Sequence, residues 1–110
     1  MTSPKIHTID VHELKRRRDA EPTLCLIDVR ELNEWQAMHI PGALHIPKDE
    51  IVGKIAKQIP EQDKPIYLHC QGGVRSLYAA EFLANMGYKE VYSINGGIAE
   101  WAKSGYPIEK

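Results

Sequence analysis

The chain has 110 residues, of which 43% are hydrophobic and 26% are charged, and its formal net charge is −1. This length fits one domain, and the composition is ordinary for a soluble globular protein. The small net charge gives no reason to expect binding to nucleic acid or to an anionic membrane, so any attraction for anions has to be local.

The first half of the chain alternates short apolar runs with helix-like stretches. Residues 6–9 predict a weak first strand, and Asp10 with Glu13 has capping-box spacing for a helix over 11–18. Basic residues at 15–18 favour the end of that helix through its dipole, as a solvated face; docking of an acidic partner is the alternative. The pattern then predicts a strand over 24–29, a short helix over 31–38 and an extended segment over 44–46.

The second half opens on the clearest amphipathic pattern of the sequence. In a helix over 49–59, one buried face is predicted to hold Ile51, Val52, Ile55 and Ile59. This pattern has the helical period, so it indicates a helix that covers a core rather than a strand.

A strand over 66–68 and a helix over 76–86 follow. That helix is nearly all apolar, so we expect it to be heavily buried, with Gly87 as its C-terminal cap. A last strand over 90–94 leads into a final short helix, which is predicted to turn three side chains inward: Ile98, Trp101 and Ala102. Strands separated by helices indicate right-handed crossovers, and hence an α/β fold with a parallel sheet covered on both faces.

Cys70 opens the loop Cys70-Gln71-Gly72-Gly73-Val74-Arg75 between a predicted strand and a predicted helix. A cysteine at such a turn faces backbone N–H groups and the positive end of the helix dipole. That field favours the thiolate, which is the nucleophilic form. N–H groups from about Gln71 to Ser76 can form an anion-binding nest, for which Gly72 and Gly73 are expected to supply positive φ and room. We therefore interpret Cys70 as a nucleophile; a plain turn made by two glycines is the alternative.

Charged residues near this loop have two interpretations each. Arg75 either holds an anionic donor or braces the loop through a carboxylate. Asp28 and Glu34 are candidate braces. Arg30, near the end of its strand, either lines the mouth of the pocket or lies on the surface.

The histidines and tryptophans are expected to be structural. His69 precedes Cys70, but adjacent strand residues point to opposite faces, so it is a poor candidate for a general base. His39 is expected to be a hydrogen-bonding hinge, and Trp35 and Trp101 to be core anchors. The five histidines form no ligand spacing, so no metal site is predicted.

The cysteines and the start of the sequence bear on the compartment. Cys25 lies in an aliphatic strand and is expected to be a small core residue, so a disulfide with Cys70 is not predicted. No stretch approaches the ~20 apolar residues of a membrane span. Residues 1–5 lack the apolar core of a secretory signal. We therefore expect a cytoplasmic location and no membrane partner.

Three motifs follow one another along the chain. They are Ile27-Asp28-Val29-Arg30 continuing through Glu34-Trp35 to His39-Ile40-Pro41-Gly42-Ala43, then Cys70 to Ser76, then Asn95-Gly96-Gly97 with Trp101 and Gly105-Tyr106-Pro107. Together they resemble the single-domain rhodanese (sulfurtransferase) family. The resemblance covers roughly residues 6–107, so residues 1–110 are expected to be one rhodanese domain. Met38 departs from it, because the family commonly has glycine there.

The resemblance implies a rhodanese-like α/β fold, with a central parallel sheet of about five strands flanked by helices on both faces. It also implies a catalytic cysteine that cycles through a persulfide, as in covalent catalysis generally. Thiosulfate or a persulfide would donate sulfane sulfur, and cyanide, a small thiol, thioredoxin or a partner protein would accept it. No cofactor is implied.

Three alternatives stay open at this stage. Cysteine phosphatases and related arsenate reductases use a similar loop, but with one residue more than the four between Cys70 and Arg75, and no aspartic acid here is well placed as a general acid. A non-catalytic binding module would not need the cysteine with an intact glycine loop. A dedicated persulfide carrier keeps the chemistry but serves one partner protein.

Overall fold

The computed structural model describes residues 6–110, so the expected lack of a secretory signal in residues 1–5 lies outside the described part. The elements are, in order, β1 (Ile6–Ile9), α1 (Val11–Ala20), β2 (Cys25–Asp28), α2 (Leu32–Ala37), β3 (Leu44–His45), the 3₁₀ helix η1 (Lys48–Glu50), α3 (Ile51–Gln58), β4 (Ile66–His69), α4 (Val74–Asn85), β5 (Val91–Ile94) and α5 (Gly97–Lys103). All the predicted strands and helices are present, with boundaries that differ by a few residues. No helix between residues 6 and 110 is both long enough and apolar enough to span a bilayer.

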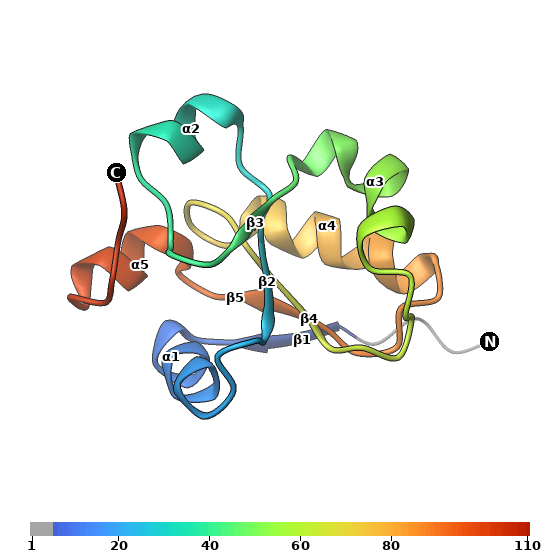
Figure 1. The fold of residues 1–110 in the computed structure, drawn as a ribbon, viewed down its shortest axis with the longest axis horizontal. Helices are drawn as coiled ribbons and strands as arrows, with labels where there is room; N and C mark the ends of the chain where they lie inside the picture. Colours follow the sequence, from blue (N-terminus) through green and yellow to red (C-terminus); the bar gives the residue numbers. More distant parts are fainter. Residues whose placement is uncertain (1–5) are drawn as a thin grey trace.

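The strands form one parallel sheet in the order β1-β5-β4-β2-β3 (Figure 1). Strands β2, β4 and β5 are buried along their whole length, which explains why most of their residues are apolar and do not alternate with polar ones. From β4 the chain proceeds to β5 on one side, whereas from β2 it proceeds to β3 on the other. The carboxyl ends of β2 and β4 therefore form a switch point, where ligands bind in such folds.

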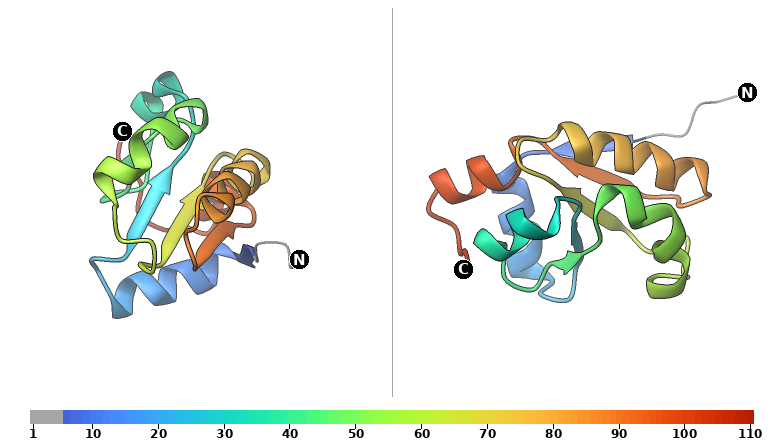
Figure 2. Two further views of the ribbon diagram at one scale, coloured as in Figure 1. Left: turned by 90° about the vertical axis from the view of Figure 1, so that its right-hand side faces the viewer. Right: turned by 90° about the horizontal axis from the view of Figure 1, so that it is seen from above.

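Helices cover both faces of the sheet (Figure 2). On one face α3 and α4 bury Ile51, Ile55 and Leu83, and on the other α1 and α5 bury Leu14 and Trp101. This arrangement confirms the predicted α/β fold with a five-stranded parallel sheet.

Helix α1 begins as predicted and ends two residues later. The Asp10 carboxylate accepts a hydrogen bond of 2.8 Å from the Glu13 N–H, which confirms Asp10 as the N-cap. The Glu13 carboxylate bonds Arg17 rather than completing a reciprocal capping box, because the arginine lies one turn further along the same side.

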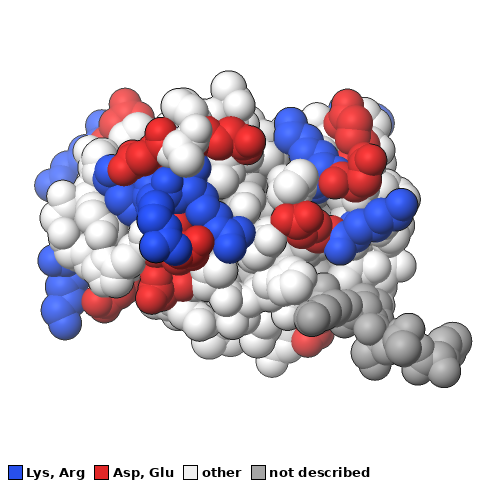
Figure 3. Space-filling view, turned by 90° about the horizontal axis from the view of Figure 1, so that it is seen from below, with Lys and Arg blue, Asp and Glu red and all other residues white. Residues whose placement is uncertain are grey.

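Three of the four basic residues at 15–18 are paired within α1, and the fourth, Arg18, donates to the Pro41 carbonyl at 2.6 Å. Lys15 pairs with Asp19, and Arg16 and Arg17 both pair with Glu13. Figure 3 shows this face, where basic and acidic side chains lie intermingled. A solvated face therefore describes the run better than a docking patch for an acidic partner.

Two predictions about helix burial are wrong in part. Ile51 and Ile55 of α3 and Ile59 directly after it are buried, but Val52 is 52% exposed. Helix α4 buries only the side that meets the sheet, and its outer side exposes Val74, Leu77, Tyr78 and Phe82. The apolar composition of α4 led to an overestimate of its burial, because one face of a sheet can cover only one side of a helix.

The ends of the last two helices follow the prediction more closely. Gly87 has a φ of 107° and donates to the Ala84 carbonyl at 3.1 Å, which confirms it as the cap of α4. On α5, Ile98 and Trp101 are buried as expected, whereas Ala102 is only partly buried. The inward face of this helix is therefore narrower than predicted.

Candidate active site

Cys70 follows β4 directly, at the carboxyl end of the sheet, and is 1% exposed. The loop it opens is held from outside by the start of α5. The N–H of Ile98 donates to the Cys70 carbonyl at 2.9 Å, and the N–H of Ala99 donates to the Gln71 carbonyl at 3.1 Å. Because these carbonyls point outward to α5, the N–H groups of the loop are free to point inward.

Gly97 makes this close approach between α5 and the loop feasible. A Cβ atom at Gly97 would lie 2.4 Å from the Cys70 carbonyl oxygen and 2.5 Å from that of Gln71, and φ there is 54°. A side chain would therefore separate the two segments. Nothing in the local sequence of the Asn95-Gly96-Gly97 motif indicates this role, because the contact joins it to a loop more than 20 residues earlier.

The Cys70 sulfur is surrounded by hydrogen-bond donors. The backbone N–H groups of Gly73 and Ser76 donate to Sγ at 3.1 Å and 3.4 Å, and the Ser76 hydroxyl oxygen lies 3.6 Å from it. Burial alone raises the pKa of the Cys70 thiol, but hydrogen bonds from Ser76, Gly73 and Gly72 outweigh it and bring the pKa below its usual value. The loop therefore stabilises a thiolate, as the spacing predicted.

The two loop glycines differ in what they contribute. Gly73 has a φ of 114°, and a Cβ atom there would lie 3.3 Å from the Ile94 carbonyl oxygen. A Cβ atom at Gly72 would meet nothing within 4 Å, and its φ is not positive. The prediction that both glycines supply positive φ and room is therefore correct for Gly73 and wrong for Gly72. The side chains of Gln71 and Val74 are exposed.

Arg75 forms a two-armed ion pair with Glu34. Its terminal nitrogens lie 2.6 Å and 2.9 Å from the two carboxylate oxygens, which joins α4 to α2. The hydrogen bonds to Arg75 lower the pKa of the Glu34 carboxyl to about 2, and those to Glu34 raise the pKa of Arg75. Of the two proposed braces, Glu34 is therefore the one that meets Arg75.

Asp28 and Arg30 form a second pair, beneath the site. Asp28 is 0% and Arg30 2% exposed, and the Arg30 Nε and Nη2 atoms donate to the carboxylate at 3.0 Å and 2.8 Å. Arg30 also donates to the Met38 carbonyl at 2.7 Å. Both expectations for Arg30, pocket mouth and surface, are wrong, because a buried carboxylate two residues earlier draws the guanidinium inward.

His69 lies against this buried pair rather than beside the sulfur. Its Nε2 is 3.6 Å from an Asp28 carboxylate oxygen, and its Nδ1 is 3.3 Å from the Cys70 carbonyl oxygen. Burial lowers the pKa of the His69 imidazole, and the Asp28 charge opposes that only in part. A neutral imidazole that contacts backbone and carboxylate fits the structural role predicted for it.

The turn after α2 is built on stacked rings. His39 Nδ1 lies 2.9 Å from the Trp35 carbonyl oxygen, and the two rings stack at 3.9 Å. The hydrogen bond expected of His39 is therefore present. Trp101 is fully buried as predicted, whereas Trp35 is only partly buried.

One functional candidate was not singled out by sequence. Ser93 on β5 is 1% exposed, and its hydroxyl lies 2.8 Å from that of Ser76. A hydroxyl in the strand Val91–Ile94, whose residues are all buried, needs a polar partner, and that requirement was the available signal.

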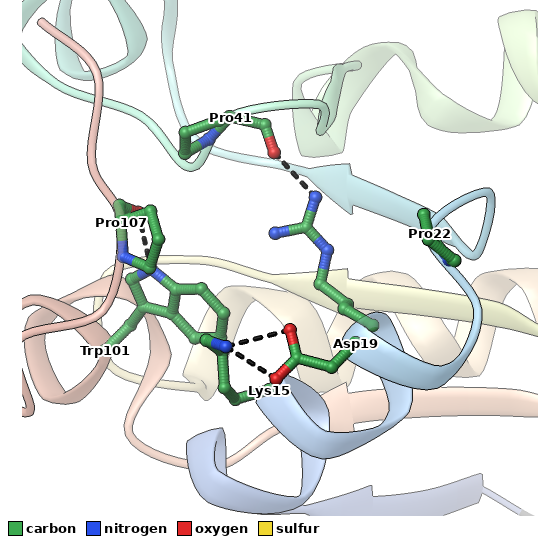
Figure 4. A pocket seen from close by; sticks show the side chains of 7 residues that line it. Lys15, Asp19, Pro22, Pro41, Trp101 and Pro107 are labelled. Carbon is green, nitrogen blue, oxygen red and sulfur yellow. Dashed lines mark hydrogen bonds and ion pairs between the residues drawn. The ribbon is translucent and has the colours of Figure 1, made fainter.

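A separate pocket lies on the other side of α5, away from Cys70. Figure 4 shows Trp101 and Pro107 on one side of it, Pro22 on the other, and the Lys15–Asp19 ion pair below. None of the residues that line it belongs to the Cys70 loop. Over residues 6–110 there is also no group of three or more His, Cys, Asp or Glu side chains placed to hold a metal ion.

The chain matches known proteins over most of its length. The model of the rhodanese-like domain family matches residues 10–104. The thiosulfate sulfurtransferase GlpE of Vibrio cholerae is 34% identical over 84 residues, which cover 76% of this chain and 77% of GlpE. The protein YqhL of Bacillus subtilis is 46% identical over 76 residues, 69% of this chain and 59% of YqhL.

The chain also resembles a solved structure, and it matches only part of some longer relatives. The crystal structure of the Alr3790 protein from Anabaena sp. superposes with a TM-score of 0.84 at 30% identity, over 92% of this chain and 79% of that one. Other curated relatives are longer, and the chain spans 51% of one and 26% of another. Activities of those longer proteins therefore do not pass directly to this chain.

Proposed function

Because the chain belongs to the rhodanese-like domain family, we propose that it is a sulfurtransferase that works through a persulfide on Cys70. Thiosulfate or a persulfide is the donor, and cyanide or a thiol is the acceptor. The observation that carries the proposal is the ring of donors around the Cys70 sulfur: two backbone N–H groups within 3.4 Å and a hydroxyl at 3.6 Å.

The reaction has two balanced halves. In the first, the Cys70 thiolate attacks the outer sulfur of thiosulfate, a new S–S bond forms, and the bond to the sulfonate sulfur breaks so that sulfite leaves with its electron pair. In the second, cyanide attacks the terminal sulfur, thiocyanate leaves, and the Cys70 thiolate returns. Neither half requires a proton transfer, so the neutral, buried His69 is not needed as a base.

The hydrogen-bond donors around the Cys70 sulfur act in both halves of the reaction. The resting enzyme and the persulfide each carry one negative charge near the loop centre. Fixed N–H groups aimed at that charge stabilise it without reorganisation, as in an oxyanion hole. The positive φ of Gly73 places its N–H in this ring.

Arg75 acts in this proposal as a brace rather than a ligand for the donor. Its guanidinium already satisfies both oxygens of Glu34, which holds α2 against α4 at the edge of the loop. This pairing also favours sulfur transfer over the phosphatase alternative, in which a free arginine would have to hold a phosphate. Release of phosphate from p-nitrophenyl phosphate at a rate that rivals sulfur transfer would reverse this preference.

A protein acceptor is supported by the surface next to the loop. Val74 follows Gly73 directly and is 68% exposed, and Tyr78, one turn further along α4, is 55% exposed. Apolar side chains exposed beside a reactive cysteine favour contact with another protein. A screen of cyanide, small thiols and thioredoxin as acceptors would test this, and equal rates with all of them would argue against a dedicated carrier.

Intact mass spectrometry tests the central proposal. We expect wild-type protein to gain one sulfur atom on incubation with thiosulfate and to lose it to cyanide with formation of thiocyanate. The Cys70→Ser variant should gain nothing, whereas the matched Cys25→Ala variant should behave as wild type. An adduct on Cys70→Ser would place the nucleophile elsewhere, and no adduct on any variant would favour a binding module or another donor.

A further inference from the structure

Ser93 lies behind the candidate nucleophile at the end of a chain of hydroxyl groups. It is on β5, the neighbour of β4, and is 1% exposed. Its oxygen lies 2.8 Å from Ser76 Oγ, which in turn lies 3.6 Å from Cys70 Sγ. These two contacts therefore connect a hydroxyl in the core of the sheet with the Cys70 sulfur.

The direction of these hydrogen bonds depends on the charge of the sulfur. A serine hydroxyl has one proton to donate and two lone pairs that accept. While Cys70 is a thiol, its S–H donates to Ser76, and the Ser76 hydroxyl donates to the Gly73 carbonyl at 3.2 Å. The second lone pair of Ser76 is then open to the Ser93 hydroxyl.

Loss of the thiol proton reverses the contact between Ser76 and the sulfur. The thiolate can only accept, so the Ser76 hydroxyl has to turn from the Gly73 carbonyl to the sulfur. Gly73 lies at the N-cap of α4 and is only partly buried, so its carbonyl is not enclosed in the core when Ser76 turns away. The Ser76 hydroxyl then donates its one hydrogen bond to the sulfur, so toward Ser93, 2.8 Å away, it can only accept.

We propose that Ser93 is a positioning residue, whose hydroxyl holds that of Ser76 in the orientation that donates to the Cys70 thiolate. This inference rests on the proposed function, in which that thiolate is the nucleophile. Both serines are buried, so water does not substitute for the missing donor when Ser93 is changed.

The charged groups near Cys70 are held by other partners. Arg75 on α4 is paired with Glu34, and His69 on β4 faces Asp28 on β2. Among the hydrogen bonds of residues 6–110, neither Ser76 nor Ser93 contacts any of these four side chains. A change in the titration of Cys70 on substitution of Ser93 would therefore pass through Ser76.

The test is the pKa of Cys70, measured from the ultraviolet absorbance of its thiolate after subtraction of the Cys70→Ser spectrum. We expect Ser93→Ala to raise this pKa by about half a unit, which is roughly a threefold loss of thiolate below the pKa. Ser93→Thr keeps the hydroxyl and should restore the wild-type value. Tyr92→Phe removes a hydroxyl from the opposite side of the same strand and should leave the value unchanged.

A double variant tests whether Ser93 acts on Cys70 through Ser76. In a Ser76→Ala background, Ser93→Ala should add no further shift, because the intermediary is gone. An unchanged pKa in folded Ser93→Ala, an equal rise in Ser93→Thr, or additive shifts in the double variant would each overturn the inference. If Ser93→Ala raises the pKa but wild type takes no sulfur from thiosulfate or a persulfide, the positioning role stands and the proposed function fails.

Discussion

The two cysteines of this chain are both buried, yet their surroundings move their acidity in opposite directions. Cys25 is 9% exposed within strand β2, and burial raises the pKa of its thiol. Cys70 is 1% exposed, and although burial acts on it in the same sense, hydrogen bonds from its loop lower its pKa overall. Burial therefore does not decide which cysteine is reactive; the donors aimed at the sulfur do.

The difference arises from the backbone around each residue. In a strand, the N–H groups near Cys25 are committed to neighbouring strands, as in its pairing with Ile66 on β4. After Cys70 the chain leaves the sheet, and α5 takes up the loop carbonyls, so N–H groups remain for the sulfur. A buried cysteine is thus a core residue where the adjacent N–H groups are hydrogen-bonded within the sheet, and a nucleophile where they are available to its sulfur.

Exchange of each cysteine in turn should give the largest contrast. We expect Cys70→Ser to abolish sulfur transfer and Cys25→Ala to retain it, with a stability loss of about 1 kcal/mol from a small core cavity. Thiocyanate formation and thermal unfolding measure the two effects. Comparable loss of activity in both variants would break the comparison, because it would give Cys25 a part in the chemistry.

Substitution of glycines should show how far the donor arrangement depends on the close approach of α5. We expect Gly97→Ala to lower transfer by about 100-fold or more, because its Cβ atom would displace the carbonyls of Cys70 and Gln71 and so turn the N–H groups away from the sulfur. The matched variant Gly72→Ala, whose Cβ atom meets nothing within 4 Å, should stay within a few-fold of wild type.

Rates of sulfur transfer, together with the unfolding midpoint of each variant, measure this effect. If Gly97→Ala keeps both its activity and its stability, the loop does not need α5 to orient its peptide groups. A large loss in Gly72→Ala would show that flexibility of the loop matters more than the fixed donors.

Titration of the two thiols should sharpen the contrast at a smaller scale. The Cys70 thiolate should form below the usual thiol pKa and that of Cys25 above it, so difference spectra of wild type against each single-cysteine variant should show two separate steps. A lowered pKa adds stability that is present above the unfolded-state thiol pKa and is lost as pH falls through the folded value. A single shared step would mean that the loop donors do not outweigh burial.

Sequence could predict the layout because each element carries its own local signal. The mostly apolar strands, the Asp10 cap and the Gly87 cap depend on residues close in the chain, and they were predicted to within a few positions. The position of Cys70 at a carboxyl end of the sheet follows from the alternation of strands and helices alone.

The rest depends on contacts between segments far apart in the chain. The Arg75–Glu34 pair joins residues 41 positions apart, and Ser76 meets Ser93 across 17 positions. Arg30 was misplaced because its partner Asp28 is itself buried, which no local pattern reveals. Burial of α4 was overestimated because composition does not show how much of a helix the sheet covers.

The smallest effect is expected at the Arg75–Glu34 brace, whose side chains are 33% and 27% exposed. We expect Arg75→Ala to lower the free energy of unfolding by about 1 kcal/mol, since solvent screens the pair, and to leave the thiosulfate KM within about twofold. The pKa of Glu34 is about 2 in the folded chain, below its unfolded value, so this stability is present above the unfolded value and is lost as pH falls toward 2.

Urea unfolding at neutral and acidic pH measures this, with Glu34→Gln as the matched change on the other side of the pair. Both variants should lose stability at neutral pH, and their difference from wild type should shrink on acidification because Glu34 is then protonated in every state. A rise of the KM for thiosulfate in Arg75→Ala but not in Glu34→Gln would mean that the guanidinium holds the donor. In that case the hydrogen-bond donors around the Cys70 sulfur would not by themselves explain why Cys70 is reactive and Cys25 is not.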